Sequence, residues 1–250
     1  RYGGPLVLLL DEFDNLLRAE FFGAGLLDQL RAASNEGHCR FIFAGFRELL
    51  NESSRHDSPF FNFTKPLRLK EFSREDAAAM IILPLENLRI RLDNREEMVS
   101  RIFELTSGQP NLIQFYCSYL VEKLERSDER RLSPADLEGF HSDENFRAFL
   151  TNTFMDNTDH LEKAIVFSLL LDGDKLSGGF DLERIDEALQ SCGVEQLLGD
   201  IERGCRTLEL AGIFTKQGWR YQFAVPAFPS IMRANYNVKY LLRKIQSEGI

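Results

Sequence analysis

The sequence predicts an α/β region followed by an all-helical region and a small domain of three helices and a β-hairpin. Three observations lead to this fold class. Two short apolar runs of strand length lie in the first part of the chain, apolar residues recur with helical spacing through the middle, and a glycine turn joins two alternating segments near the end. The region boundaries that we expect are residues 1–71, 72–155 and 156–250.

The first region alternates between strand and helix patterns, which is typical of an α/β sheet. Pro5–Leu10 is a continuous apolar run, as expected for a strand buried on both faces of a parallel sheet. The other segments follow in order: a helical pattern over Phe13–Ala33 that Gly23–Gly25 can interrupt, a strand at Cys39–Ala44, a polar loop at Asn51–Ser58 and a short strand at Leu67–Leu69.

The second and third regions read as helical. Ser73 is a good N-cap, and its helix Ala77–Leu83 is ended or kinked by Pro84. The remaining helices of the second region are expected at Arg95–Thr106, at Asn111–Leu124 and from Ser133–Asp136 toward Phe140. In the third region we expect helices at Glu162–Leu171, Leu182–Gln190 and Val194–Leu210, a hairpin over Gly212–Phe223 and a last helix at Met232–Ile245. Three helices followed by a hairpin form the outline of a winged helix.

Composition places the chain among soluble globular proteins, with 44% hydrophobic and 28% charged residues. No apolar run approaches the roughly 18 residues that span a bilayer, so no membrane association is expected. The four cysteines form no CxxC pair, which favours free thiols in a reducing, cytoplasmic compartment. The chain opens at Arg1 almost directly on a strand, so we expect an earlier part of the polypeptide to precede it.

The segment Leu6–Asp14 has the form of a Walker B motif, in which a buried strand ends in Asp and Glu. Ligands collect at the C-terminal ends of the strands in open α/β sheets. Asp11 is placed to hold Mg²⁺ through water, because Mg²⁺ prefers oxygen ligands. Glu12 is placed to orient the water that attacks a γ-phosphate. The alternative reading is a buried strand that ends in acids at a helix N-terminus.

Two further segments have the residue types of a nucleotide site. Arg40–Arg47 contains an apolar strand that ends in Gly and leads to Arg47. It resembles the strand that carries a γ-phosphate sensor in nucleotide-binding ATPases, where a Ser, Thr or Asn is expected at the position of Phe46. Gly108-Gln109-Pro110 opens a helix, where Pro needs no N–H and Gly lets the backbone approach a ligand. A surface Arg and an ordinary helix start are the competing readings.

The order of these pieces resembles the signalling (STAND) and archaeal-type branch of the AAA+ P-loop ATPases, over nearly all 250 residues. The resemblance implies part of a P-loop NTPase sheet, a helical lid and a winged-helix domain. It implies ATP or ADP and Mg²⁺ as ligands, with Asp11 and Glu12 catalytic and Gly108, Pro110 and Arg47 near the nucleotide. It also implies a switch that acts through self-association or through an attached effector or sensor domain.

The phosphate cradle GxxxxGK[ST], or Walker A motif, occurs nowhere in the sequence. The resemblance therefore implies an ATPase in the full-length protein and an inactive chain when these residues stand alone. An upstream segment of the same polypeptide would supply the cradle.

Two other functions fit parts of the sequence. One is a DNA-associated ATPase of the origin-recognition or transposition-helper type, and the other is a scaffold that has lost nucleotide binding. The net charge of −9 disfavours DNA. So does the composition of the candidate recognition helix, whose bases are Arg203 and Arg206 and whose acids are Glu195, Asp200, Glu202 and Glu209.

Overall fold

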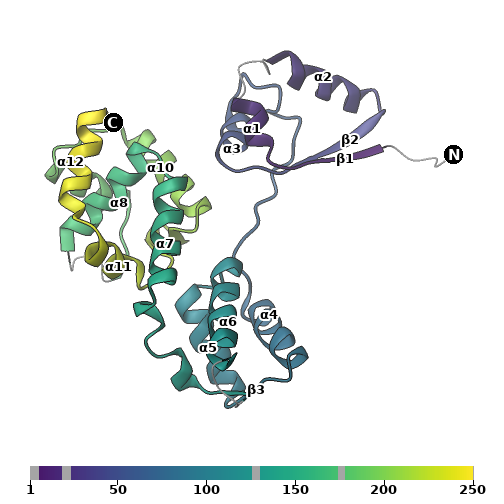
Figure 1. Cartoon of the computed structure of the whole chain (residues 1–250). Helices are drawn as coiled ribbons and strands as arrows, with labels where there is room; N and C mark the ends of the chain where they lie inside the picture. The colour runs from purple at the N-terminus through teal and green to yellow at the C-terminus, as the bar shows by residue number, and fades with distance from the viewer. Residues whose placement is uncertain (1–5, 19–23, 126–129, 174–177, 250) are drawn as a thin grey trace. The chain divides into compact units, whose positions relative to one another are not determined.

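The computed structural model describes residues 6–18, 24–125, 130–173 and 178–249 of the 250-residue chain (Figure 1). The chain divides into two compact units, residues 1–69 and residues 70–250. The finer division at residues 71 and 155 stays a prediction. In the described part of the chain, every helix is too short or too polar to cross a membrane.

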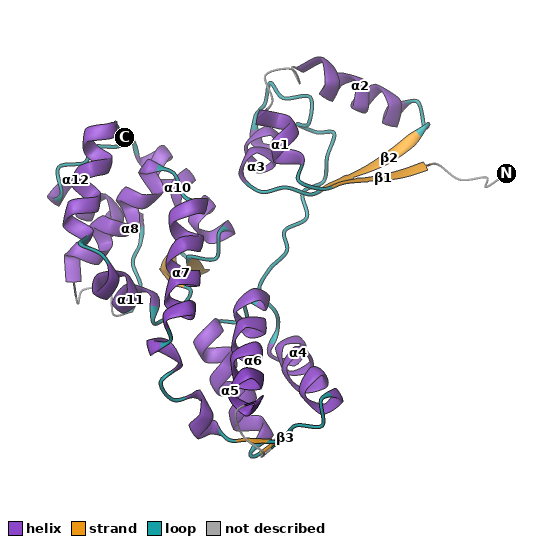
Figure 2. Cartoon of the chain, in the orientation of Figure 1, coloured by secondary structure: helices purple, strands orange, loops and turns teal. Residues whose placement is uncertain are grey.

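The first unit is built around two parallel strands (Figure 2). β1 (Leu6–Leu10) pairs with β2 (Cys39–Phe43) along its whole length, from Leu6 opposite Cys39 to Leu10 opposite Phe43. These strands lie where the apolar runs predicted them. The unit also contains three helices: α1 (Phe13–Arg18), α2 (Ala24–Asn35) and α3 (Arg47–Ser54). The expected interruption at Gly23–Gly25 falls partly on Gly23, which lies outside the described residues.

The prediction that the first strand is buried on both faces is wrong for this chain. Leu6 is 61% exposed and Leu9 is 75% exposed, although they are as apolar as core residues. The physical reason is that, among the described residues, β1 has β2 as its only pairing strand. The small core of this unit, Phe13, Leu27 and Phe60, is packed by Leu10 and Phe43 from the last positions of the two strands, which leaves the rest of β1 uncovered.

The expected strand at Leu67–Leu69 does not form. Its backbone is irregular, and Leu67 and Leu69 are 84% and 89% exposed. A strand needs a neighbour to receive its backbone hydrogen bonds, and the described residues supply none here. The expected loop at Asn51–Ser58 is shorter than predicted, because α3 extends to Ser54.

In the second unit, three helices come first: α4 (Arg74–Asn87), α5 (Arg95–Thr106) and α6 (Pro110–Glu125). The Ser73 side chain accepts a hydrogen bond from Asp76 N at 3.1 Å, so the predicted N-cap is confirmed. Pro84 lies inside α4 and does not end it. Two short parallel strands that the sequence patterns did not predict, β3 (Arg91–Leu92) and β4 (Arg131–Leu132), lie between helices.

The segment after β4 differs from the single helix expected there. Two short 3-10 helices, η1 (Pro134–Leu137) and η2 (Phe140–Ser142), precede a full helix, α7 (Glu144–Asn157). Gly139 has a φ of 79°, in the left-handed region, and this turn separates the two short helices. Asp143 then caps α7 by accepting a hydrogen bond from Phe146 N at 2.9 Å.

The last part of the second unit contains α8 (His160–Asp172), α9 (Leu182–Ser191), α10 (Leu198–Leu210), the hairpin β5 (Phe214–Gln217) and β6 (Arg220–Phe223), α11 (Phe228–Asn235) and α12 (Val238–Glu248). The hairpin is antiparallel, and Phe180 adds a bridge to Tyr221. Helix α10 starts four residues later than predicted. The predicted last helix is split in two, because Asn237 accepts a hydrogen bond from Tyr240 N and starts α12 anew.

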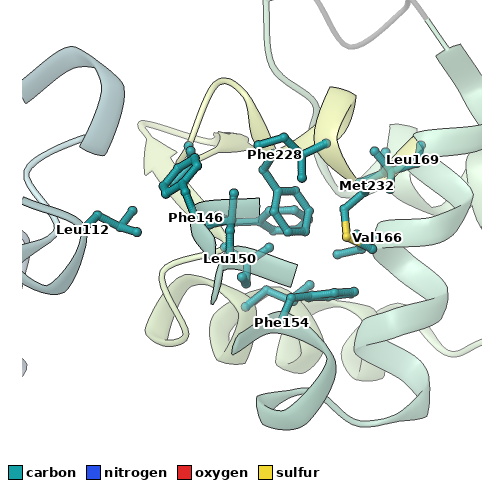
Figure 3. Packing of buried hydrophobic residues seen from close by; sticks show 14 of the residues in the cluster. Leu112, Phe146, Leu150, Phe154, Val166, Leu169, Phe228 and Met232 are labelled. Atoms are coloured by element: carbon teal, nitrogen blue, oxygen red, sulfur yellow. The ribbon is translucent and has the colours of Figure 1, made fainter. Parts of the chain in front are cut away.

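A continuous hydrophobic core runs through the second unit. Figure 3 shows Phe146, Leu150 and Phe154 of α7 beside Val166 and Leu169 of α8, and Phe228 and Met232 of α11. The rings of Phe154 and Phe228 meet edge to face with centroids 5.4 Å apart. This packing joins α7 to the helices that follow it.

Candidate functional site

The two acids of the Walker B-like segment follow β1 directly. Asp11 and Glu12 are both exposed. Asp11 Oδ1 accepts a hydrogen bond from Glu12 N at 2.8 Å, and Glu12 adopts a positive φ of 51°. A left-handed conformation is uncommon for a residue that is not Gly, and such conformations cluster at functional sites. The backbone thus turns sharply at Glu12 and leaves both carboxylates accessible to solvent.

The loop after β2 lies beside this turn. Ala44 N donates to Leu10 O at 2.8 Å, and Phe13 N donates to Ala44 O at 2.9 Å. These two bonds continue the parallel pairing past the ends of both strands, whose last residues, Leu10 and Phe43, are already opposite each other. The residues after Leu10 and the residues after Phe43 therefore form one edge of the sheet.

Arg47 begins α3 on this second loop and is half-buried. Its neighbour Glu48 pairs with Arg18 of α1, with Arg18 Nε and Glu48 Oε1 3.3 Å apart. The fold therefore places the sensor-like residue on the loop next to the one that carries Asp11 and Glu12. The contact between Arg47 and a nucleotide stays a prediction.

Asp14 is the residue that the motif reading left without a role. Its side chain is 5% exposed, and its two carboxylate oxygens accept hydrogen bonds from the second loop, Oδ2 from Phe46 N at 2.5 Å and Oδ1 from Glu48 N at 2.6 Å. A signal was present in the sequence, because an acid in the first turn of a short helix normally faces helix N–H groups. The local pattern did not show that these groups belong to a different helix.

Gly108 and Pro110 lie in the second unit, at the start of α6. Gly108 has a φ of 75°, and a Cβ there would lie 2.6 Å from Phe72 O, so the position requires Gly. Phe72 N donates to Gly108 O at 2.9 Å. Next to it, Ser107 Oγ donates to Ala224 O and Gln109 Nε2 donates to Gly212 O at 2.7 Å. This turn therefore joins the helices α4–α6 to the β5–β6 hairpin, a contact that the sequence did not predict.

The donor set of the first unit fits Mg²⁺ better than it fits a metal held entirely by protein. Among the described residues, no group of three or more His, Cys, Asp or Glu side chains is arranged to hold a metal ion. Mg²⁺ is usually bound through one or two carboxylates together with water and substrate phosphates. The exposed Asp11 and Glu12 could supply those carboxylates. The GxxxxGK[ST] motif, which would bind the phosphates, does not occur in the sequence.

Arg55, a second arginine of the first unit, is engaged by its own neighbours. Its guanidinium lies 2.8 Å from Glu52 Oε1 and 2.7 Å from Asp57 Oδ2. The hydrogen bond from Arg55 lowers the pKa of the Asp57 carboxyl below its usual value. This arrangement is that of a surface loop, with Arg55 held by acids of its own segment.

The search against known protein families found no match to the sequence, and no curated protein matches it. Solved structures do match the fold. The Walker-type ATPase PABY2304 of Pyrococcus abyssi is 15% identical with a TM-score of 0.58, and the match covers 92% of this chain. The ORC2 protein of Aeropyrum pernix, solved in ADPNP and ADP complexes, is 13% identical with a TM-score of 0.60, and the match covers 98% of this chain.

The chain spans 63% of the length of the first of these proteins and 66% of the second, so it corresponds to less than two thirds of either. At this level of identity the similarity shows the fold and not the activity. The chain has an AAA+ ATPase-like fold.

Proposed function

We propose that the protein is an ATP-dependent switch of the STAND or AAA+ type, in which nucleotide binding and hydrolysis rearrange a helical lid and a winged-helix domain. The observation that supports this most is the paired loop edge of the first unit. There, an Asp-Glu pair at the end of β1 lies beside the Arg47-bearing loop at the end of β2, within an AAA+-like fold. The C-terminal edge of a parallel sheet is where such folds bind ligands.

In this proposal three residues of the first unit have separate roles in binding and hydrolysing the nucleotide. Asp11 would hold Mg²⁺ through water, and an ion bound there would supply positive charge to the phosphates. Glu12 accepts a hydrogen bond from the attacking water and orients it. Arg47 contacts the phosphate end of the nucleotide. Both carboxylates are exposed, so they are accessible to a ligand approaching this edge.

The phosphate cradle has to come from outside these 250 residues, and we propose that a preceding segment of the same polypeptide supplies it. The exposed apolar side chains of β1 support this, since Leu6, Val7 and Leu9 are each more than half exposed. A strand of this composition normally lies inside a parallel sheet covered on both faces. A further strand and its helix would bury these side chains and bring a phosphate-binding loop to the same edge.

The remaining regions would transmit the nucleotide state. We propose that α4–α6 act as the lid, that α8–α10 with the β5–β6 hairpin are the winged helix, and that Gly108 and Pro110 face the nucleotide. A switch of this kind requires ATP and ADP to favour different arrangements of the two regions. Self-association or an attached effector or sensor domain would read out the change.

The DNA-associated alternative has less support than the switch. The two arginines of α10 are both occupied within the helix, Arg203 by Asp200 and Arg206 by Glu202. Affinity for DNA comes largely from Lys and Arg that are available to phosphates. The helix that would enter the major groove therefore offers carboxylates next to each of its bases.

The test is Mg-ATP binding and hydrolysis by the longest natural form of the protein, compared with residues 1–250 alone and with a Glu12→Gln variant of the long form. We expect the long form to bind and hydrolyse ATP, the variant to bind with slower turnover, and residues 1–250 to do neither. A long form that binds no nucleotide would refute the switch and leave the scaffold reading.

A further inference from the structure

We propose that Asp14 is a positioning residue that fixes the loop carrying Arg47 against the turn carrying Asp11 and Glu12. This inference rests on the proposed ATPase function and adds a residue for which the motif itself provides no role. We name the arrangement of the Asp14 carboxylate, Gly45 and the amides of Phe46 and Glu48 the Asp14 clamp.

The clamp joins two segments that are far apart in the sequence. Asp14 lies two residues after Glu12, and its carboxylate accepts from the backbone amides of Phe46 and Glu48, on the two sides of Arg47. Both bonds are short, at 2.5 and 2.6 Å. Each oxygen has its own donor, so the side chain is held at two points and cannot rotate without losing one of them.

The clamp replaces the local cap that α3 lacks. The residue before α3, Phe46, has no side-chain hydrogen bond to cap the helix. The first N–H groups of a helix have no partner within the helix and are normally satisfied by a Ser, Thr, Asp or Asn immediately before it. Here the acceptor comes from α1, so the start of α3 is held by the segment that follows the two candidate catalytic acids.

Gly45 makes the close approach possible. A Cβ on Gly45 would overlap Oδ2 of Asp14, the oxygen that binds Phe46 N, and would also approach Leu49. The backbone of Gly45 is not in the left-handed region that restricts side chains. Its requirement for Gly therefore comes from its neighbours, mainly from the Asp14 carboxylate, which makes Gly45→Ala a probe of the same contact from the opposite side.

The structure gives a physical reason to expect a catalytic effect. A catalytic group must be held within about 0.5 Å of its productive position by the residues that support it. The position of Arg47 depends on the two backbone amides that flank it, and both are bound to Asp14. Asp14 is buried and lies two residues after Glu12, so its two hydrogen bonds tie the Arg47 loop to the segment that carries Asp11 and Glu12.

Asp14→Asn is the sharpest variant, since it keeps the side-chain volume and changes one acceptor into a donor. An Asn can accept from one of the two amides, and its NH₂ group would face the other N–H. In the form that hydrolyses ATP, we expect Asp14→Asn and Gly45→Ala each to lower kcat on the order of 10- to 100-fold, with little change in KM. In residues 1–250, both variants should speed amide hydrogen exchange at Phe46 and Glu48.

The matched control is Asp181→Ala, because Asn would still cap the helix and Ala removes the cap. Asp181 caps α9 by accepting from Arg184 N at 2.8 Å, far along the chain and in the second unit. This variant should lower Tm by an amount comparable to the Asp14 variant and leave kcat unchanged. If Asp14→Asn destabilises the first unit too far for assay, Gly45→Ala tests the same clamp.

The outcomes separate the two proposals. If Glu12→Gln slows turnover while Asp14→Asn and Gly45→Ala keep wild-type kcat, Asp14 is a structural cap only, and the positioning role is overturned while the ATPase stands. If the wild-type long form hydrolyses no ATP, the proposed function fails and the positioning role fails with it. Loss of kcat together with faster exchange at Phe46 and Glu48 supports the clamp.

Discussion

The two units differ in how far their apolar side chains are buried. In the first unit, Leu9 is 75% exposed and the buried core consists of Phe13, Leu27 and Phe60. In the second unit one continuous cluster extends from α4 to α12, and Phe154 is fully buried within it. The difference shows that the second unit is held by packing, whereas the candidate site of the first unit is held by hydrogen bonds between two loops.

The comparison is tested most strongly by removing one large apolar side chain from each unit and measuring the change in unfolding free energy. Phe154→Ala should cost about 3–5 kcal/mol of unfolding free energy, because its ring packs against Phe167 and Phe228 and leaves a cavity. Leu9→Ala in residues 1–250 should change the free energy by about 0.5 kcal/mol or less, because the side chain is mostly in solvent. Urea unfolding followed by circular dichroism measures both.

Equal costs for these two substitutions would contradict the comparison, since they would show that Leu9 is buried in solution. In the longest natural form we expect the cost of Leu9→Ala to rise toward that of a core residue, if a further strand covers β1. A cost that stays near zero there would argue against the covering segment.

A smaller effect is expected where the second unit relies on a polar contact. Gln109→Ala should lower the unfolding free energy by about 1 kcal/mol, since it removes the bond to Gly212 O between α6 and the hairpin. The control is Gln190→Ala, whose amide binds Asp186 one turn earlier on the exposed face of α9. That variant should stay within about 0.5 kcal/mol. If the two behave alike in urea unfolding, the contact between Gln109 and the hairpin is not formed in solution.

The smallest effect concerns the surface of α10. Arg206→Gln removes an exposed ion pair with Glu202 and should cost about 0.3–0.5 kcal/mol at low salt. In 1 M salt the difference should vanish, because the Debye length falls to about 3 Å. Thermal unfolding at the two salt concentrations measures it. A cost that persists at high salt would show that Arg206 contributes by packing of its side chain rather than by the ion pair with Glu202.

Local signals predicted several helices well. Ser73 was predicted as an N-cap, and it caps α4 in the structure. The apolar spacing of Arg95–Thr106 gave the bounds of α5. These predictions succeed because a cap and its helix lie within one turn of each other, so the interacting residues are adjacent in the sequence.

Other elements were missed although a signal was present. Asp143 followed by Phe146, Leu150 and Phe154 is a capped helix with apolar positions every four residues, and it forms α7. Asn237 is likewise a capping residue within the stretch that was predicted as one helix, and it divides α11 from α12. In contrast, the strands β3 and β4 are two residues long and carry no periodicity that could be recognised.

The sequence by itself determined the order of chemical groups: an apolar strand that ends in Asp11 and Glu12, a second strand that leads to Arg47, and a chain without a phosphate cradle. Only the tertiary structure decided that Asp14 holds the Arg47 loop, that Gln109 reaches Gly212, and that β1 stays exposed. The reason is physical. A cap or an apolar stripe is encoded within a few residues, whereas these contacts join residues 34 and 103 positions apart, and burial depends on which other strands are present to cover a surface.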